Sequence, residues 1–277
     1  SHRGKAYSAV HEEAIANLRE LMQIPDTHAV LFLQGGASTQ FAMLPMNLLG
    51  EGQTADYTNS GAWATKAIKE ARLIGNVRIA ADCADDLPTR VPRPDELSLT
   101  PGAAYLHMTT NETISGAQWK TMPQTDIPLA ADMSSDILSR PLDVRPFGVI
   151  YAGLQKNLGP AGAAVVIVRK DLAERAPATV PTMFKYATHI EKNSLFNTPP
   201  CFCVYMLMLV TRWLKAEGPK TVYRRNIDKA ARLYAAIDES DFYTGTAAPE
   251  CRSDMNVTWR LPSEELEATF VAEATEA

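Results

Sequence analysis

The sequence predicts an α/β protein with a mostly parallel sheet that helices cover on both faces. Two observations support this prediction. Short runs that are apolar throughout alternate along the chain with longer segments whose apolar residues recur at helical spacing. The short runs lack the polar–apolar alternation of a half-exposed strand, which indicates strands that are buried on both faces.

The expected elements follow one another in order. A helix over about residues 6–23 comes first, because its apolar residues share one face. The strand 29–33, a glycine-rich turn and a helix to about residue 49 come next. Further helices are expected at 62–74, 201–216 and 220–238, and further strands at 76–81, 103–108, 128–132, 148–153 and 163–169.

The chain changes character from about residue 218. A long charged helix there leads to a strand-like segment at 255–261 and a final helical pattern. We therefore expect a large domain over residues 1–215 and a partial α+β domain over 216–277. The sequence lacks an initiator methionine and stops inside the last helical pattern, so we expect a piece of a longer polypeptide.

Composition excludes several classes of protein. Among 277 residues, 46% are hydrophobic and 21% charged, which is typical of a globular chain rather than a disordered one. The net charge of −5 argues against a general nucleic-acid binder. The longest apolar run spans ten residues, half of the roughly 20 that cross a bilayer. The four cysteines have no zinc spacing, so we expect reduced thiols, no metal site and a cytoplasmic protein.

Polar or glycine-rich residues follow three of the expected strands, at the edge where α/β sheets bind ligands. The turn at 35–39 lets backbone amides approach a phosphate, or is a plain tight turn. Asp132 is a solvated turn cap or a functional carboxylate. Lys156 is a surface lysine, as most lysines are, or a nucleophile activated by desolvation.

Together these three features match the needs of pyridoxal phosphate. This cofactor requires a lysine for its aldehyde, an acid for its pyridinium nitrogen and an amide-lined cradle for its phosphate. An aromatic ring that covers the flat cofactor completes such a site. Trp63, after the sequence Ser-Gly-Ala, is the candidate for that ring, with core packing as the alternative.

Eight short motifs occur in an order that closely resembles the phosphoserine aminotransferase family, a class V, fold-type I group of pyridoxal-phosphate enzymes. The resemblance runs over essentially the whole chain and implies that family's seven-stranded type of sheet. The stretches Ala-Gly-Leu-Gln-Lys-Asn and Asn-Thr-Pro-Pro are specific to the family, and the glycine turn is not. The motifs lie at residues 1–5, 34–41, 55–57, 61–63, 111–113, 130–135, 150–162 and 196–200.

The resemblance implies roles for the residues around the cofactor ring. Lys156 resembles the Schiff-base lysine, which also moves the proton between the substrate carbon and the cofactor. Asp132 resembles the partner of the pyridinium nitrogen, and Trp63 resembles the stacking ring. Thr113 resembles the residue that binds the phenolic oxygen of the cofactor.

The resemblance also implies how the phosphate is bound. Ala37 and Ser38 match the backbone positions of the phosphate cradle, and Gln155 matches a further phosphate ligand. Asn197 and Thr198 resemble the pair that reaches the cofactor phosphate from the other subunit, which implies a homodimer. Many family members have an arginine where this chain has a serine at position 38, so a hydroxyl replaces a guanidinium.

His2 and Arg3 resemble the substrate-recognising pair of the family, and a guanidinium suits a planar carboxylate or phosphate. The glycine- and proline-containing stretch upstream of this pair is absent here. A late segment with a His-Arg pair and a further arginine, which helps to hold the phosphorylated substrate, is also absent. The cofactor site is therefore expected to be more complete than the substrate site.

The expected activity is a transamination. It interconverts O-phospho-L-serine plus 2-oxoglutarate with 3-phosphohydroxypyruvate plus L-glutamate, and extends to 4-phosphohydroxythreonine of vitamin B6 synthesis. One alternative is a cofactor-binding remnant with little activity. Another is a class V chemistry such as cysteine desulfuration, but Cys201 and Cys203 lie in an apolar helix and look structural. A non-enzymatic interaction module is the fourth possibility.

Overall fold

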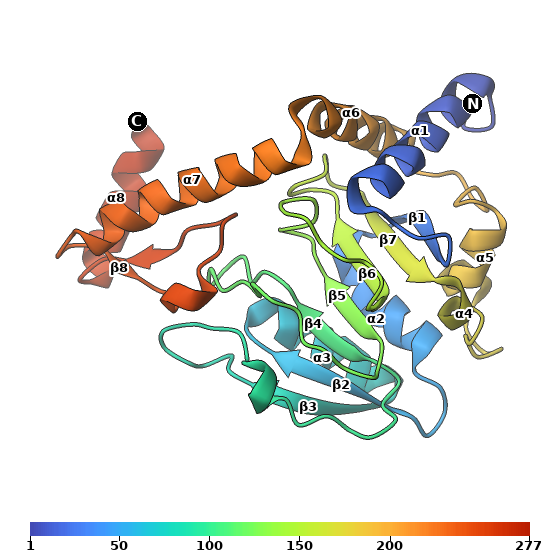
Figure 1. The fold of residues 1–277 in the computed structure, drawn as a ribbon, viewed down its shortest axis with the longest axis horizontal. Helices are drawn as coiled ribbons and strands as arrows, with labels where there is room; N and C mark the ends of the chain where they lie inside the picture. The colour runs from blue at the N-terminus through green and yellow to red at the C-terminus, as the bar shows by residue number, and fades with distance from the viewer.

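The computed structural model describes residues 1–277 and is built around one seven-stranded sheet (Figure 1). The strand order is β1-β7-β6-β5-β4-β2-β3. β7 is antiparallel to both of its neighbours, and every other pair of adjacent strands is parallel, which confirms the mostly parallel sheet. The strands are β1 His28–Gln34, β2 Thr54–Asn59, β3 Asn76–Asp82, β4 Leu106–Thr109, β5 Leu129–Asp132, β6 Phe147–Gly153 and β7 Ala163–Arg169.

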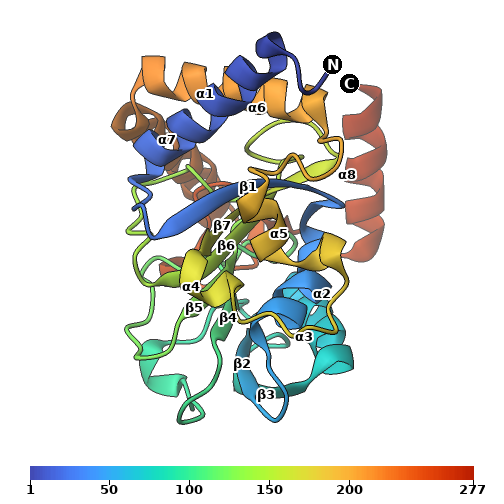
Figure 2. The same cartoon turned by 90° about the vertical axis from the view of Figure 1, so that its right-hand side faces the viewer.

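Helices cover both faces of this sheet, as the apolar strands require. On one face, α1 and α6 lie side by side (Figures 1 and 2) and bury residues such as Leu18 and Leu207 against the strands. On the other face, α2 and α3 bury Leu44 and Ile68. Burial of each such side chain stabilises the fold by about 1.5–3 kcal/mol. These helices are α1 Lys5–Met22, α2 Gly36–Leu48, α3 Ala62–Ile74 and α6 Cys201–Glu217, with the short α4 Lys170–Ala173 and α5 Tyr186–Glu191 near the edge strand β1.

The last part of the chain extends away from the large sheet. α7, Pro219–Asp238, begins where α6 ends and leads to a small antiparallel sheet (Figure 1). That sheet is formed by β8 Thr244–Gly245 and β9 Trp259–Arg260, and α8 Glu264–Glu276 follows it. The strand expected over 255–261 is therefore much shorter than predicted. None of the helices has both the length and the apolar composition needed to cross a membrane.

The reversed strand β7 determines where β1 ends. The carboxyl ends of β2, β4, β5 and β6 share one edge because these strands are parallel. β1 pairs only with β7, and its last residue, Gln34, lies opposite Ala163 at the start of β7. The glycine turn after β1 is therefore brought to the same edge as the residues that follow the parallel strands.

Strand β2 is missing from the sequence-based prediction, because its sequence Thr-Ala-Asp-Tyr-Thr-Asn is half polar. The structure shows why the polar residues are tolerated. The fully buried carboxylate of Asp56 accepts hydrogen bonds from the backbone N–H and the hydroxyl of Thr100, at 2.6 and 2.7 Å. The compensating partner lies 44 positions along the chain, so the local sequence gives no sign of it.

Three aromatic rings, from β2, β4 and β6, stack in a row on one face of the sheet. His107 stacks on Tyr57 at 4.6 Å between ring centroids and on Tyr151 at 5.9 Å. Its Nε2 lies 2.9 Å from the Tyr151 hydroxyl. Burial lowers the pKa of His107 from 6.5 to about 3, so the imidazole is neutral in the folded protein at neutral pH.

This neutral histidine is expected to make the fold sensitive to acid. Below pH 6.5 the unfolded chain binds a proton at this residue and the folded chain does not, so stability falls until the pH approaches 3. Between pH 7.5 and pH 4.5, the unfolding free energy of the wild type should fall by about 2.5 kcal/mol more than that of His107→Gln. Urea titrations of both proteins at the two pH values measure this difference. Equal losses would show that His107 does not contribute.

Candidate active site

A cavity of about 310 Å³ lies at the carboxyl edge of the sheet. Larger hollows of about 530, 610 and 700 Å³ open elsewhere, but neither Lys156 nor Asp132 lines them. The smaller cavity collects six of the residues expected from the sequence, which are far apart along the chain. Its lining comprises Gly35, Gly36, Ala37, Ser38, Trp63, Thr109, Asn111, Asp132, Ser134, Ser135, Gln155, Lys156, Ala161 and Gly162.

Lys156 follows β6 and lines the cavity. Its Nζ donates a short hydrogen bond to Oγ1 of Thr113 and lies 5.1 Å from the centroid of the Trp63 ring. Desolvation by the cavity walls lowers the pKa of Lys156, while the carboxylates of Asp132 and Glu112 oppose this shift. A lysine with a lowered pKa has a larger neutral fraction, which is the form that reacts with a carbonyl.

Asp132 is the last residue of β5, and its carboxylate is held in one orientation. Both the backbone N–H and the hydroxyl of Ser134 donate to its Oδ1, at 2.9 and 2.6 Å. The Ser134 hydroxyl also accepts a hydrogen bond from the N–H of Gly153, which ties the ends of β5 and β6 together. Burial raises the pKa of Asp132, and these hydrogen bonds and Lys156 oppose the shift. The second oxygen, Oδ2, accepts no hydrogen bond from the protein and is available to a ligand.

The glycine turn presents the start of α2 to the cavity. Gly35 and Gly36 have φ angles of +87° and +62°, which glycine adopts without strain. A Cβ on Gly35 would lie 1.9 Å from Oγ1 of Thr39, so no other residue fits there. The first amides of a helix have no partner within the helix. Ala37 and Ser38, at the start of α2, both line the cavity. Such amides, together with the helix dipole, bind an anion.

Two further residues of the cavity carry buried polar atoms without a partner. Oγ1 of Thr109 and Oδ1 of Asn111 accept no hydrogen bond, although both residues are buried. A ligand with polar substituents would satisfy them. The set of lysine, oriented carboxylate, aromatic ring, anion cradle and unsatisfied polar atoms fits pyridoxal phosphate. Sequence reasoning assigned no role to Thr109, Asn111 or Ser134, although their positions at the end of β4 and just after β4 and β5 were a usable signal.

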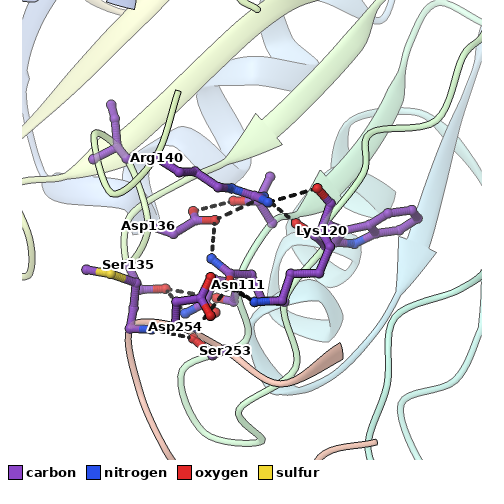
Figure 3. Close-up of polar contacts among 12 residues, drawn as sticks. Asn111, Lys120, Ser135, Asp136, Arg140, Ser253 and Asp254 are labelled. Carbon is purple, nitrogen blue, oxygen red and sulfur yellow. Dashed lines mark hydrogen bonds and ion pairs between the residues drawn. The ribbon is translucent and has the colours of Figure 1, made fainter. Parts of the chain in front are cut away.

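Side chains from the last part of the chain bind the loop after β4, which carries Asn111 (Figure 3) and Thr113. Asn111 donates from Nδ2 to the hydroxyl of Ser135 and to Oδ1 of Asn256, at 2.8 and 2.7 Å. Asn256 in turn donates to the backbone carbonyl of Thr113 at 2.8 Å. The loop that positions the hydrogen-bond partner of Lys156 is therefore held from the C-terminal part of the chain.

The same loop is held again a few residues later. Lys120 forms an ion pair with Asp254 at 2.9 Å, and the N–H of Asp254 donates to Oε1 of Gln118. Gln118 also donates to the buried carboxylate of Asp136, which lies 3.9 Å from the Arg140 guanidinium (Figure 3). These contacts connect the segment after β5 with both the loop after β4 and the C-terminal residues.

Thr113 contacts Lys156 but does not line the cavity itself, and four more of the residues expected in the site do not line the cavity of their own chain. His2 and Arg3 lie in a turn before α1, and Asn197 and Thr198 lie in the segment before α6. The backbone carbonyl of Thr198 accepts a hydrogen bond from the Gln34 side chain at 2.8 Å. This contact places the segment beside the end of β1, next to the glycine turn. The roles of all four residues stay predictions.

Comparisons with known proteins agree with this geometry. The family model of class-V aminotransferases matches residues 1–276. The phosphoserine aminotransferase of Desulfatibacillum aliphaticivorans is 53% identical over 100% of this chain and 77% of its own length. That of Niallia circulans is 54% identical over 98% of this chain and 76% of its own length.

Solved structures agree in fold as well. A structure described as the phosphoserine aminotransferase from Bacillus circulans subsp. alkalophilus superposes with a TM-score of 0.95 at 51% identity, covering 100% of this chain and 77% of that one. The pyridoxal-phosphate-bound phosphoserine aminotransferase from Trichomonas vaginalis gives 0.95 at 36% identity, with 100% and 80% covered. The expected fold-type I architecture is thus confirmed, and the chain belongs to the class-V aminotransferase family.

Proposed function

We propose that this chain is a pyridoxal-phosphate-dependent transaminase. Its reaction interconverts O-phospho-L-serine plus 2-oxoglutarate with 3-phosphohydroxypyruvate plus L-glutamate, as in serine biosynthesis. The main observation that supports this proposal is that one cavity is lined by Lys156, Asp132, Trp63 and the start of α2. Identity above 50% to proteins named phosphoserine aminotransferase, over the whole chain, supports the choice of substrates.

Each residue has a defined part in this proposal. When bound, pyridoxal phosphate supplies an aldehyde that takes up the amino group and a protonated ring that accepts electrons. Lys156 would hold the cofactor and would also carry the transferred proton at its Nζ. Asp132 would keep the ring nitrogen protonated, Trp63 would stack on the ring, and Thr113 would bind its phenolic oxygen.

The phosphate is assigned to the start of α2. The amides of Ala37 and Ser38 and the side chain of Gln155 bind it. All three residues line the cavity, as do Gly35 and Gly36 of the glycine turn. The Ser38 hydroxyl adds a hydrogen bond, whereas an arginine would add a full charge.

We further propose a homodimer in which Asn197 and Thr198 reach the cofactor of the second subunit. Large apolar side chains near this pair support an interface: Phe202 is 66% exposed and Tyr205 is 44% exposed. His2 and Arg3 are assigned to the carboxylate or phosphate of the substrate.

The arrangement into domains belongs to the same proposal. Residues 1–215 form the cofactor-binding domain, since they contain every strand of the large sheet. Residues 216–277 belong to a smaller domain. All four cysteines are free, as is usual in a reducing compartment, and we assign the protein to the cytoplasm.

The test follows the visible absorbance of the cofactor-loaded protein. L-Glutamate is expected to convert the bound cofactor from its aldehyde form to its amine form, and 3-phosphohydroxypyruvate is expected to reverse the change. L-Alanine, which lacks the second carboxylate, is the control and should cause little conversion. A cofactor band that does not respond to glutamate would identify a binding remnant, and the absence of any band would refute the proposal.

A further inference from the structure

The carboxylate of Glu112 lies against the start of α3, the helix that carries Trp63. Its Oε2 accepts a hydrogen bond from the N–H of Trp63 at 3.2 Å, and its Oε1 accepts one from the N–H of Ala64 at 3.0 Å. Glu112 is fully buried. A buried charge needs such partners, and here two backbone amides provide them.

These two hydrogen bonds replace a local cap that α3 lacks. The residue before the helix is Gly61, which has no side chain to bind the first amides. Gly61 adopts a φ of +154°, and a Cβ at this position would lie 2.9 Å from Cδ of Glu112. The glycine therefore allows the distant carboxylate to approach and cap the helix in its place.

Glu112 is also the residue next to Thr113, which binds Lys156. One dipeptide thus contacts both the helix that carries the stacking ring and the partner of the lysine. We propose that Glu112 is a positioning residue, which fixes the Trp63 ring over the cofactor by holding the start of α3. This role rests on the proposed function, because it concerns the same cofactor site.

The first test is a double-mutant cycle on the affinity for pyridoxal phosphate. Glu112→Gln keeps the size of the side chain but turns an NH₂ group toward one of the two amides, so one hydrogen bond is lost. Its dissociation constant should rise roughly five- to tenfold, the size of a lost helix cap. In a Trp63→Ala background, the same change should raise it less than about twofold, because the ring that Glu112 positions is gone.

The matched control is Asp56→Asn. Asp56 is another fully buried carboxylate that accepts two hydrogen bonds, and it does not line the cavity. This variant reports what general destabilisation does to cofactor affinity. An effect of Glu112→Gln that equals the control, or that is the same in both Trp63 backgrounds, would overturn the positioning role.

A second measurement needs no cofactor. Amide hydrogen exchange in residues 61–66 should become faster in Glu112→Gln and faster still in Glu112→Ala, while exchange in β4 stays unchanged. Unaltered exchange at the start of α3 would overturn the proposal even if cofactor affinity falls. If the wild-type protein fails to bind pyridoxal phosphate, the proposed function fails. The exchange result then decides separately whether Glu112 holds Trp63.

Discussion

Replacing Lys156 by alanine is expected to abolish transamination while leaving the fold intact. Lys156 is the one lysine that lines the cavity, and its Nζ is held by a hydrogen bond to Thr113. Removal of the group that binds the cofactor and moves the proton should lower turnover by roughly 10⁴-fold or more. Mass spectrometry after borohydride reduction should find the cofactor fixed to the wild type and not to the variant.

Lys66 provides the control for this experiment. Its Nζ also lies close to the Trp63 ring, 4.3 Å from the centroid, but it does not line the cavity. Lys66→Ala should therefore keep both borohydride labelling and activity. Labelling that persists in Lys156→Ala, or that disappears in Lys66→Ala, would contradict the assignment of the lysine.

Replacing Asp132 by alanine is expected to weaken cofactor binding and to slow the removal of the substrate α-proton most of all. Ser134 donates two hydrogen bonds to Oδ1 and none to Oδ2, and the charge of the carboxylate would stabilise the protonated ring. Loss of such electrostatic stabilisation should slow the half-reaction with L-glutamate by roughly 10²–10³-fold. Stopped-flow absorbance measures this rate directly.

Two comparisons separate the charge of Asp132 from its shape. Asp132→Asn keeps an acceptor for Ser134 but carries no charge, so it should be nearly as slow as the alanine variant. With glutamate deuterated at the α-carbon, the isotope effect of both variants should exceed that of the wild type. An asparagine variant with wild-type rates would show that the charge of Asp132 is not used.

The sequence predicted the parts of the fold that depend on local pattern. Apolar runs and helical spacing located six of the seven strands of the main sheet and the helices that cover it. Strand β2 was missed because the partner of Asp56 is Thr100, far along the chain. The reversed direction of β7 was equally invisible, because an apolar run carries no information on strand direction.

The sequence also predicted part of the candidate site. Motifs at strand ends identified Lys156, Asp132, Trp63 and the glycine turn, which the structure brings together. The residues that orient them were not found, because each acts across the fold. Ser134 is defined by its hydrogen bonds to Asp132, and Glu112 by amides nearly 50 positions earlier. Asn197 and Thr198, which the resemblance assigns to the cofactor of the other subunit, do not line the cavity of their own chain, and their role stays a prediction.

The hydrogen bonds between Asn256 and the Asn111–Thr113 loop limit how far this protein can be divided. The cofactor residues all precede position 215, so a fragment cut there would contain each of them. That fragment would still lose the donor to the Thr113 carbonyl and the ion-pair partner of Lys120. The chain can therefore be cut at residue 215 without removing a cofactor residue, but the cut removes contacts that hold the loop of the cofactor site. Transplanting the cofactor-binding part into another protein would require residues 253–256 as well.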